Sequence, residues 1–182
     1  LNIPYSQDEA EIGQRIAQIE EKNDIILDDI QKQAVHKAVL NGLMVITGGP
    51  GTGKTTTINT IIKYFEMEGL EIRLAAPTGR AAKRMAETSG YEAQTIHRLL
   101  EICGSASDSQ NTGMHFERNE DNPLETDVII VDEMSMVDTE IFYLLLRAIP
   151  NGCQIILCGD PDQIESVGCG SVFRDLLNSN TF

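Results

Sequence analysis

Short apolar runs alternate with helical patterns along most of this chain. Four runs rich in Val, Ile, Leu and Ala predict buried strands, at residues 43–47, 71–76, 128–132 and 154–158. Apolar residues three and four positions apart predict helices among them, at residues 54–67, 79–88 and 141–148. Apolar runs of this length need cover on both faces, and strands separated by helices pair in parallel through right-handed crossovers. The pattern predicts an α/β fold: a mainly parallel sheet with helices on both faces.

Two further helices are predicted before the first strand. A capping box followed by isoleucines at helical intervals predicts a helix over residues 7–21. A polar break separates it from a second helix over residues 28–40, in which Gln31 lies off the apolar stripe. We expect residues 1–24 to be the end of a preceding domain, and residues 25–182 to form the main domain.

Residues 104–127 interrupt this alternation because they are rich in Ser, Asn, Asp and Gly. Such composition is typical of loops and turns rather than of buried elements. We expect an excursion from the sheet here, with a small hairpin around residues 114–118.

Charge and length limit the kind of protein. The 182 residues suit one domain, and 14 basic against 28 acidic residues give a net charge of −14. That balance argues against bulk affinity for nucleic acid, but salt screens charges beyond about 8 Å, so a local cationic groove is still compatible with it. No apolar run reaches the length of a membrane span, and no secretory signal is present.

The cysteines and the chain ends indicate the setting of the protein. Four cysteines without a C-x-x-C pair favour a reducing cytoplasm over a disulfide scaffold. The chain begins at Leu1 and stops soon after a helix-like apolar stretch. We expect it to be a fragment of a longer protein.

A glycine-rich segment supplies the strongest chemical signal. Residues 48–55 fit the pattern G-x-x-x-x-G-K-[ST], directly after a predicted strand and at the start of a predicted helix. Glycines let successive N–H groups point at phosphate oxygens, and the helix N-terminus adds partial positive charge. Lys54 would then pair with the β- and γ-phosphates, and Thr55 would offer its hydroxyl to Mg²⁺.

Polar residues after two other strands complete this candidate site. Asp132 ends the strand 128–132 and would hold the water shell of the metal, while Glu133 could take a proton from an attacking water. Gln163 follows the strand 154–158, where its amide could bond both a γ-phosphate oxygen and that water. We therefore assign catalytic roles to Lys54, Glu133 and Gln163, and metal binding to Thr55 and Asp132.

Several strings together resemble the first RecA-like motor domain of superfamily 1 DNA helicases. They are GGPGTGKTTT (48–57), APTGRAAKRM (76–85), TIHRLL (95–100), VDEMSMVD (131–138) and CGDPDQIESVGCGSVFRDL (158–176). The similarity is to the RecD-like group, which includes the exodeoxyribonuclease V alpha chain. It spans about residues 25–178 and implies a RecA-like P-loop NTPase fold.

The resemblance also implies roles for individual residues. Gln31 matches the glutamine that recognises adenine in these helicases. The full set expected to bind ATP is Gln31, Gly49, Pro50, Gly51, Thr52, Gly53, Lys54, Thr55 and Thr56. The motifs that contact single-stranded DNA are matched by Thr78, Arg80, Thr95, His97 and Arg98. Arg80, Lys83 and Arg84 would form a local basic stripe beside them.

The function implied is ATP hydrolysis coupled to 5′ to 3′ translocation along single-stranded DNA in recombination or repair. The expected cofactors are ATP and Mg²⁺. The expected partners are single-stranded DNA and subunits of a nuclease complex, and no involvement of a membrane is expected. A second RecA-like domain, absent from these 182 residues, would supply a transition-state arginine. We therefore expect this isolated chain to bind nucleotide, to hydrolyse it feebly and to unwind nothing.

Alternative interpretations stay open on sequence alone. The parent could be a conjugative relaxase, whose helicase part resembles the same group. The chain could also be a nucleotide-dependent switch or binding module, or a scaffold that has lost nucleotide binding. A zinc site made of Cys153, Cys158, Cys169 and His115 is disfavoured, because the spacings match no standard ligand pattern.

Overall fold

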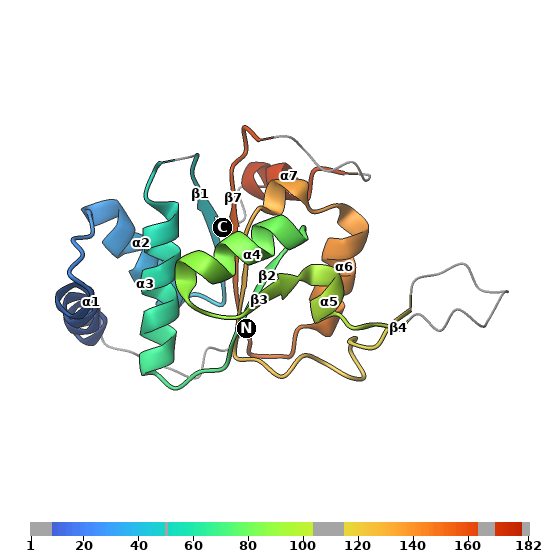
Figure 1. The fold of residues 1–182 in the computed structure, drawn as a ribbon, viewed down its shortest axis with the longest axis horizontal. Helices are drawn as coiled ribbons and strands as arrows, with labels where there is room; N and C mark the ends of the chain where they lie inside the picture. The colour runs from blue at the N-terminus through green and yellow to red at the C-terminus, as the bar shows by residue number, and fades with distance from the viewer. Residues whose placement is uncertain (1–8, 50, 104–114, 164–169, 180–182) are drawn as a thin grey trace, which may run out of the picture.

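A five-stranded parallel sheet forms the centre of the molecule (Figure 1). The computed structural model describes residues 9–49, 51–103, 115–163 and 170–179. Along the sheet the strands lie in the order β1 (Leu43–Thr47), β7 (Gln154–Gly159), β6 (Val128–Val131), β2 (Ile72–Ala76) and β3 (Ala93–Thr95). All neighbouring strands of this sheet pair in parallel, which confirms the predicted sheet.

Helices cover both faces of this sheet, as the pattern predicted. On one side lie α1 (Glu9–Asn23), α2 (Asp29–Leu40), α3 (Lys54–Met67) and α4 (Gly79–Ser89). On the other lie α5 (Ile96–Leu99), the short 3-10 helix η1 (Met134–Met136), α6 (Thr139–Ala148) and α7 (Val172–Asn178). In the described part of the chain, no helix is both long and apolar enough to cross a membrane.

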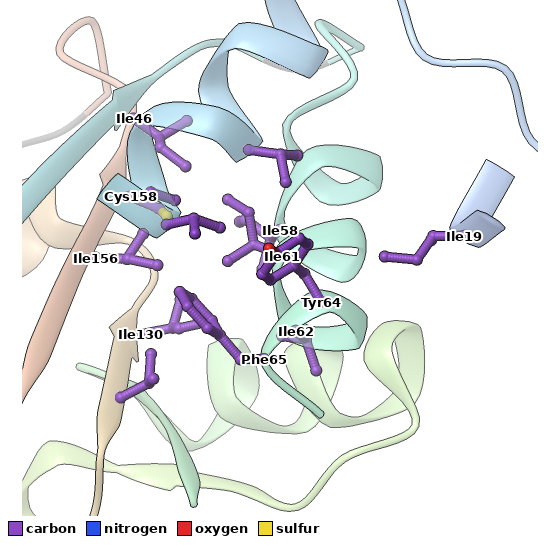
Figure 2. Packing of buried hydrophobic residues seen from close by; sticks show 14 of the residues in the cluster. Ile19, Ile46, Ile58, Ile61, Ile62, Tyr64, Phe65, Ile130, Ile156 and Cys158 are labelled. Carbon is purple, nitrogen blue, oxygen red and sulfur yellow. The ribbon is translucent and has the colours of Figure 1, made fainter. Parts of the chain in front are cut away.

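The core on the first face is built around α3. Figure 2 shows Phe65 of α3 next to Ile130 of the sheet, and the isoleucines of α3 belong to the same buried cluster as Ile130 and Ile156. Each fully buried side chain of this kind contributes about 1.5–3 kcal/mol relative to an exposed one. Ile19 of α1 reaches the same cluster from the far side of α3 (Figure 2). The N-terminal helix is thus packed into the core of the main domain.

Two local features differ from the predicted elements. β3 was not predicted, because its three residues form no apolar run. Within the described part of the chain it lies at the edge of the sheet and pairs only with β2. The predicted hairpin around residues 114–118 is wrong in its position. β5 (His115–Phe116), which lies within the polar excursion, instead pairs antiparallel with β4 (Ile102–Cys103), which directly precedes it.

Candidate functional site

The carboxyl ends of three neighbouring strands meet at one edge of the sheet. Because β7 lies between β1 and β6, the segments that follow these strands are side by side. Gly48, directly after β1, donates its backbone N–H to the carbonyl of Gly159 at the end of β7, at 3.2 Å. Ligands of open parallel sheets bind outside such strand ends, so a site is expected here.

The predicted phosphate loop between β1 and α3 is held by its own backbone. Gly51 and Gly53 have positive φ values of 78° and 79°, which residues with a side chain rarely adopt. Thr52 donates its backbone N–H and its hydroxyl to the carbonyl of Gly49, at 3.4 and 2.9 Å. Among the described residues no side-chain hydrogen bond caps the start of α3 at Gly53, so the first N–H groups of the helix can bond another acceptor. Pro50 lies outside the described residues.

Lys54 and Asp132 are brought together from different parts of the chain. Nζ of Lys54 lies 3.5 Å from Oδ1 of Asp132, and both side chains are largely buried. The same Oδ1 accepts the backbone N–H of Glu133 at 2.9 Å, which orients the Asp132 carboxylate. Thr55 is exposed in the first turn of α3, and Thr56 beside it is half-buried. A cation, a hydroxyl and a carboxylate therefore lie around one space.

Glu133 has an unusual conformation and environment. Its backbone is left-handed, with φ 57° and ψ 39°, which costs a residue other than glycine about 1–3 kcal/mol. The residue is 7% exposed. One carboxylate oxygen, Oε1, accepts a hydrogen bond from Nη2 of Arg84, while the other, Oε2, is buried without a hydrogen-bond partner among the described residues. Strained backbone and an unsatisfied buried oxygen together are typical of functional positions.

These residues line a single cavity of about 500 Å³. Its walls are formed by Gly49, Gly51, Gly53, Lys54, Thr55, Ile58, Asn59, Arg84, Met85, Thr88, Asp132, Glu133 and Gln163. Gln163 is placed by a turn in which its N–H bonds the carbonyl of Asp160 at 3.2 Å. The carboxylate of Asp160, itself buried, accepts the N–H of Asp162 at 3.0 Å. The size is in the range of small-molecule sites.

Gln31 lies next to the phosphate loop. Its Oε1 accepts the backbone N–H of Asp28 at 3.0 Å as part of a capping box at the start of α2. Its Nε2 donates to the carbonyl of Gly53 at 3.3 Å. A Cβ atom on Gly53 would displace this amide, and the positive φ of Gly53 would strain any residue with a side chain at this position.

The residues predicted to contact DNA follow the other two strands of the sheet. Thr78, after β2, caps α4 by accepting the N–H of Ala81 at 3.2 Å, and Arg80 is exposed in the first turn. Thr95, the last residue of β3, caps α5 by accepting the N–H of Arg98 at 3.2 Å. Because β2 and β3 are neighbours, the two threonine caps lie at the same edge of the sheet.

A second hollow, of about 610 Å³, is formed around α5. It is lined by Gln94, Thr95, His97, Arg98 and Glu101. The ring of His97 lies against Phe116 of β5, with 6.4 Å between ring centroids. The structure thus groups three of the five predicted DNA residues in this hollow. No sequence motif indicated the ring contact of His97 with Phe116.

The predicted basic stripe on α4 is wrong for Arg84. Its guanidinium bonds Glu133 in the cavity beside the phosphate loop, and Lys83 pairs with Glu87 at 3.8 Å. Arg80 is thus the cation that α4 presents next to its N-terminal cap. The sequence did not indicate the pairing of Arg84, since its partner lies far away in the chain and only the packing of α4 against the sheet brings the two together.

Cysteine chemistry adds no further site among the described residues. Cys153 and Cys158 are buried and free, and burial raises the pKa of the Cys153 thiol to about 12. The same cause raises the pKa of Cys158. The described ranges contain no group of three or more histidine, cysteine or acidic residues able to hold a metal ion. Cys169 lies outside those ranges.

Comparison with known proteins identifies the family to which this arrangement of residues belongs. The profile of the AAA domain family matches residues 31–169. The ATP-dependent RecD2 DNA helicase of Deinococcus radiodurans is 40% identical over 144 residues, covering 79% of this chain and 19% of that protein. The RecBCD enzyme subunit RecD of Mycolicibacterium smegmatis is 38% identical over 170 residues, covering 81% of this chain and 30% of that protein. The chain spans less than a third of these relatives.

A solved structure agrees with these sequence matches. Pif1 of Bacteroides, bound to single-stranded DNA, shares 26% identity with a TM-score of 0.53, covering 86% of this chain and 37% of that one. The likeness confirms the predicted RecA-like α/β fold, and the curated relatives confirm the predicted resemblance to RecD-like helicases. Because the family profile matches most of its length, the chain belongs to the AAA_19 family of AAA domains.

Proposed function

We propose that this chain is the ATP-binding first motor domain of a RecD-like DNA helicase. In the parent protein it would couple ATP hydrolysis to 5′ to 3′ movement along single-stranded DNA during recombination or repair. The observation that carries this proposal is the approach of Lys54 to Asp132, at 3.5 Å, in the cavity beside the phosphate loop. The similarity to RecD2 and RecD supports the DNA-dependent part.

The donor set around this cavity fits a triphosphate with Mg²⁺. Backbone N–H groups at the start of α3 and Nζ of Lys54 would hold phosphate oxygens. The hydroxyl of Thr55 and the carboxylate of Asp132 are hard oxygen ligands of the kind Mg²⁺ takes, directly or through water. When bound, Mg²⁺ would neutralise charge that develops on the phosphates.

Glu133 and Gln163 would act on the attacking water. The unpaired Oε2 of Glu133 is a buried acceptor in the wall of the cavity, which suits a base that takes a proton from water. Gln163 could bond the same water and a γ-phosphate oxygen, and so respond to the state of the nucleotide. Gln31 would recognise adenine from its place beside Gly53.

Single-stranded DNA would pass the edge formed by the ends of β2 and β3. Thr78 and Arg80 would contact its backbone at the start of α4, and Thr95, His97 and Arg98 would do so at the hollow around α5. Hydroxyls and helix starts bind phosphate without net positive charge, so such contacts are compatible with an acidic chain.

The remaining parts of the motor would lie elsewhere in the parent protein. Residues 25–182 would be the first motor domain, and residues 1–24 the end of a preceding domain docked onto it through α1. A second RecA-like domain would close the nucleotide site and supply a transition-state arginine. Subunits of a nuclease complex are possible partners of the RecD class, and the cytoplasm is the compartment we propose.

Hydrolysis by the complete protein tests this proposal. We expect single-stranded DNA to stimulate ATP hydrolysis. Glu133→Gln should lower kcat about 10²- to 10⁴-fold while nucleotide still binds, because the amide cannot accept the proton from water. A Glu133→Gln protein that keeps its function in DNA processing would instead favour a nucleotide-dependent switch. Failure of the wild-type protein to bind ATP would exclude both.

A further inference from the structure

Arg84 connects two parts of the molecule that otherwise have separate roles. It belongs to α4, the helix whose N-terminal cap and first turn carry Thr78 and Arg80. Its guanidinium nevertheless reaches the nucleotide cavity, where Nη2 donates to Oε1 of Glu133. The Arg84 side chain is 63% exposed and that of Glu133 is 9% exposed, so a surface cation is bound to a buried carboxylate.

The hydrogen bond from Arg84 distinguishes the two oxygens of Glu133. Oε1 is held by the guanidinium, whereas Oε2 is buried and has no hydrogen-bond partner among the described residues. A buried oxygen without a partner costs about 1–3 kcal/mol, so a water or a ligand is expected to bond to it. The oxygen left for the attacking water is therefore Oε2, and the guanidinium fixes the direction in which it points.

A base oriented by a third group is a recurring arrangement in hydrolytic sites. Arginine suits the orienting role, because its guanidinium stays protonated and cannot itself take the proton from water. Backbone strain gives a second reason for such support. Glu133 sits in the left-handed region, and a residue in that conformation persists only where its surroundings hold it.

The other contacts of α4 indicate what can move Arg84. Near the end of the helix, the carbonyl of Thr88 accepts a hydrogen bond at 2.9 Å from Nδ2 of Asn59 on α3. The helix is thus tied to α3 at its C-terminal end, while its exposed first turn bears Arg80. Arg84 lies six positions after Thr78, about 9 Å along the helix axis. DNA bound at the first turn would therefore act on Arg84 through one continuous helix.

We propose that Arg84 is a positioning residue for Glu133, through which DNA at the start of α4 controls hydrolysis. The inference rests on the proposed function, since it assigns Glu133 the role of base and Thr78 and Arg80 the role of DNA contacts. It predicts that Arg84 affects the rate of the chemical step, and leaves the affinity for ATP nearly unchanged.

The test uses the protein made from its complete reading frame. We would compare Arg84→Ala, Arg84→Lys and Glu133→Gln, with the double variant Arg84→Ala/Glu133→Gln, and take Arg73→Ala as the matched control. Arg73 is an exposed arginine of β2 that does not line the cavity. The readouts are Kd for labelled ATP, and kcat and KM for ATP hydrolysis with and without single-stranded DNA.

We expect Arg84→Ala to lower the DNA-stimulated kcat about 10- to 100-fold, as misplacement of a catalytic group does, with Kd and KM within about twofold of wild type. Arg84→Lys should restore part of kcat because it keeps a cation near Oε1. The double variant should be no slower than Glu133→Gln alone, since Arg84 acts through Glu133. Arg73→Ala should behave as wild type.

Two results would overturn the inference while leaving the proposed function intact. One is an Arg84→Ala protein with wild-type kcat and DNA stimulation when Glu133→Gln is inactive. The other is a double variant whose loss equals the product of the single losses. A wild-type protein that binds no ATP, or a fully active Glu133→Gln protein, would show that the proposed function itself fails. If Arg84→Ala does not fold, Arg84→Gln takes its place and the same limits apply.

Discussion

Replacing Ile16 by alanine should lower the free energy of unfolding by about 3 kcal/mol, because α1 is packed into the main core. Ile16 is 2% exposed and belongs to the same cluster as Tyr64 and Phe65 of α3. Truncation of a buried isoleucine to alanine costs about 2–5 kcal/mol, through lost burial and the cavity left behind. In a domain of this size each kcal/mol lowers Tm by about 2–4 °C, so a fall of roughly 6–12 °C follows.

Urea unfolding followed by circular dichroism would measure this loss. Ile26→Ala is the matched control, because Ile26 lies in the turn after α1 and is 93% exposed. The control should change stability by no more than about 0.5 kcal/mol. An Ile16→Ala protein with the wild-type midpoint would refute the reasoning, since it would mean that α1 does not share the core. So would a separate early transition that leaves the main one unchanged.

Three other outcomes follow from the structure. Gly53→Ala should weaken ATP binding at least about tenfold, because the new Cβ would strain a left-handed position and displace the Gln31 amide. Equilibrium titration with ATP measures the affinity, and an unchanged affinity would contradict this prediction. Arg80→Ala in the complete protein should weaken binding to single-stranded DNA and reduce the salt dependence by about one phosphate contact; an unchanged slope would place the groove elsewhere. Cys153 should resist a thiol reagent at pH 8 until the protein unfolds. Rapid labelling of the native protein would contradict this burial. Because burial raises the pKa of folded Cys153 to about 12, the contribution of the neutral thiol to stability should be lost as the pH rises from about 9 toward 12.

The strands and helices that carry strong apolar patterns were predictable from sequence. The runs at β6 and β7 are buried on both faces, so their composition alone distinguishes them from the surrounding helices. β3 was not predictable, because a three-residue edge strand is specified by backbone pairing with β2 and not by its own side chains. The position of the β4–β5 pairing was missed for a related reason. The two strands are separated by a long polar segment that carries no pattern of its own.

The residues of the candidate site were likewise predictable from sequence only in part. The phosphate loop and Asp132 were predictable, because each lies directly after a recognisable strand and parallel strands bring such ends together. Arg84 was predicted to belong to a local basic stripe beside the DNA contacts, since Arg80 and Lys83 are its sequence neighbours. Its actual partner, Glu133, depends on how α4 lies against the sheet. The contact between His97 and Phe116 was also not predictable, because it joins α5 to a short strand inside the polar excursion.

Equilibrium titration with labelled ATP, with and without Mg²⁺, tests the central claim most directly. That claim is that Lys54 and Asp132, 3.5 Å apart, serve the same triphosphate and its metal. Lys54→Ala should weaken binding about 10- to 100-fold, as loss of a hydrogen bond to a charged group costs about 1.5–3 kcal/mol. Asp132→Asn should remove most of the Mg²⁺ dependence, and Lys63→Ala on the same helix should do neither. Wild-type affinity and Mg²⁺ dependence in both site variants would contradict the account.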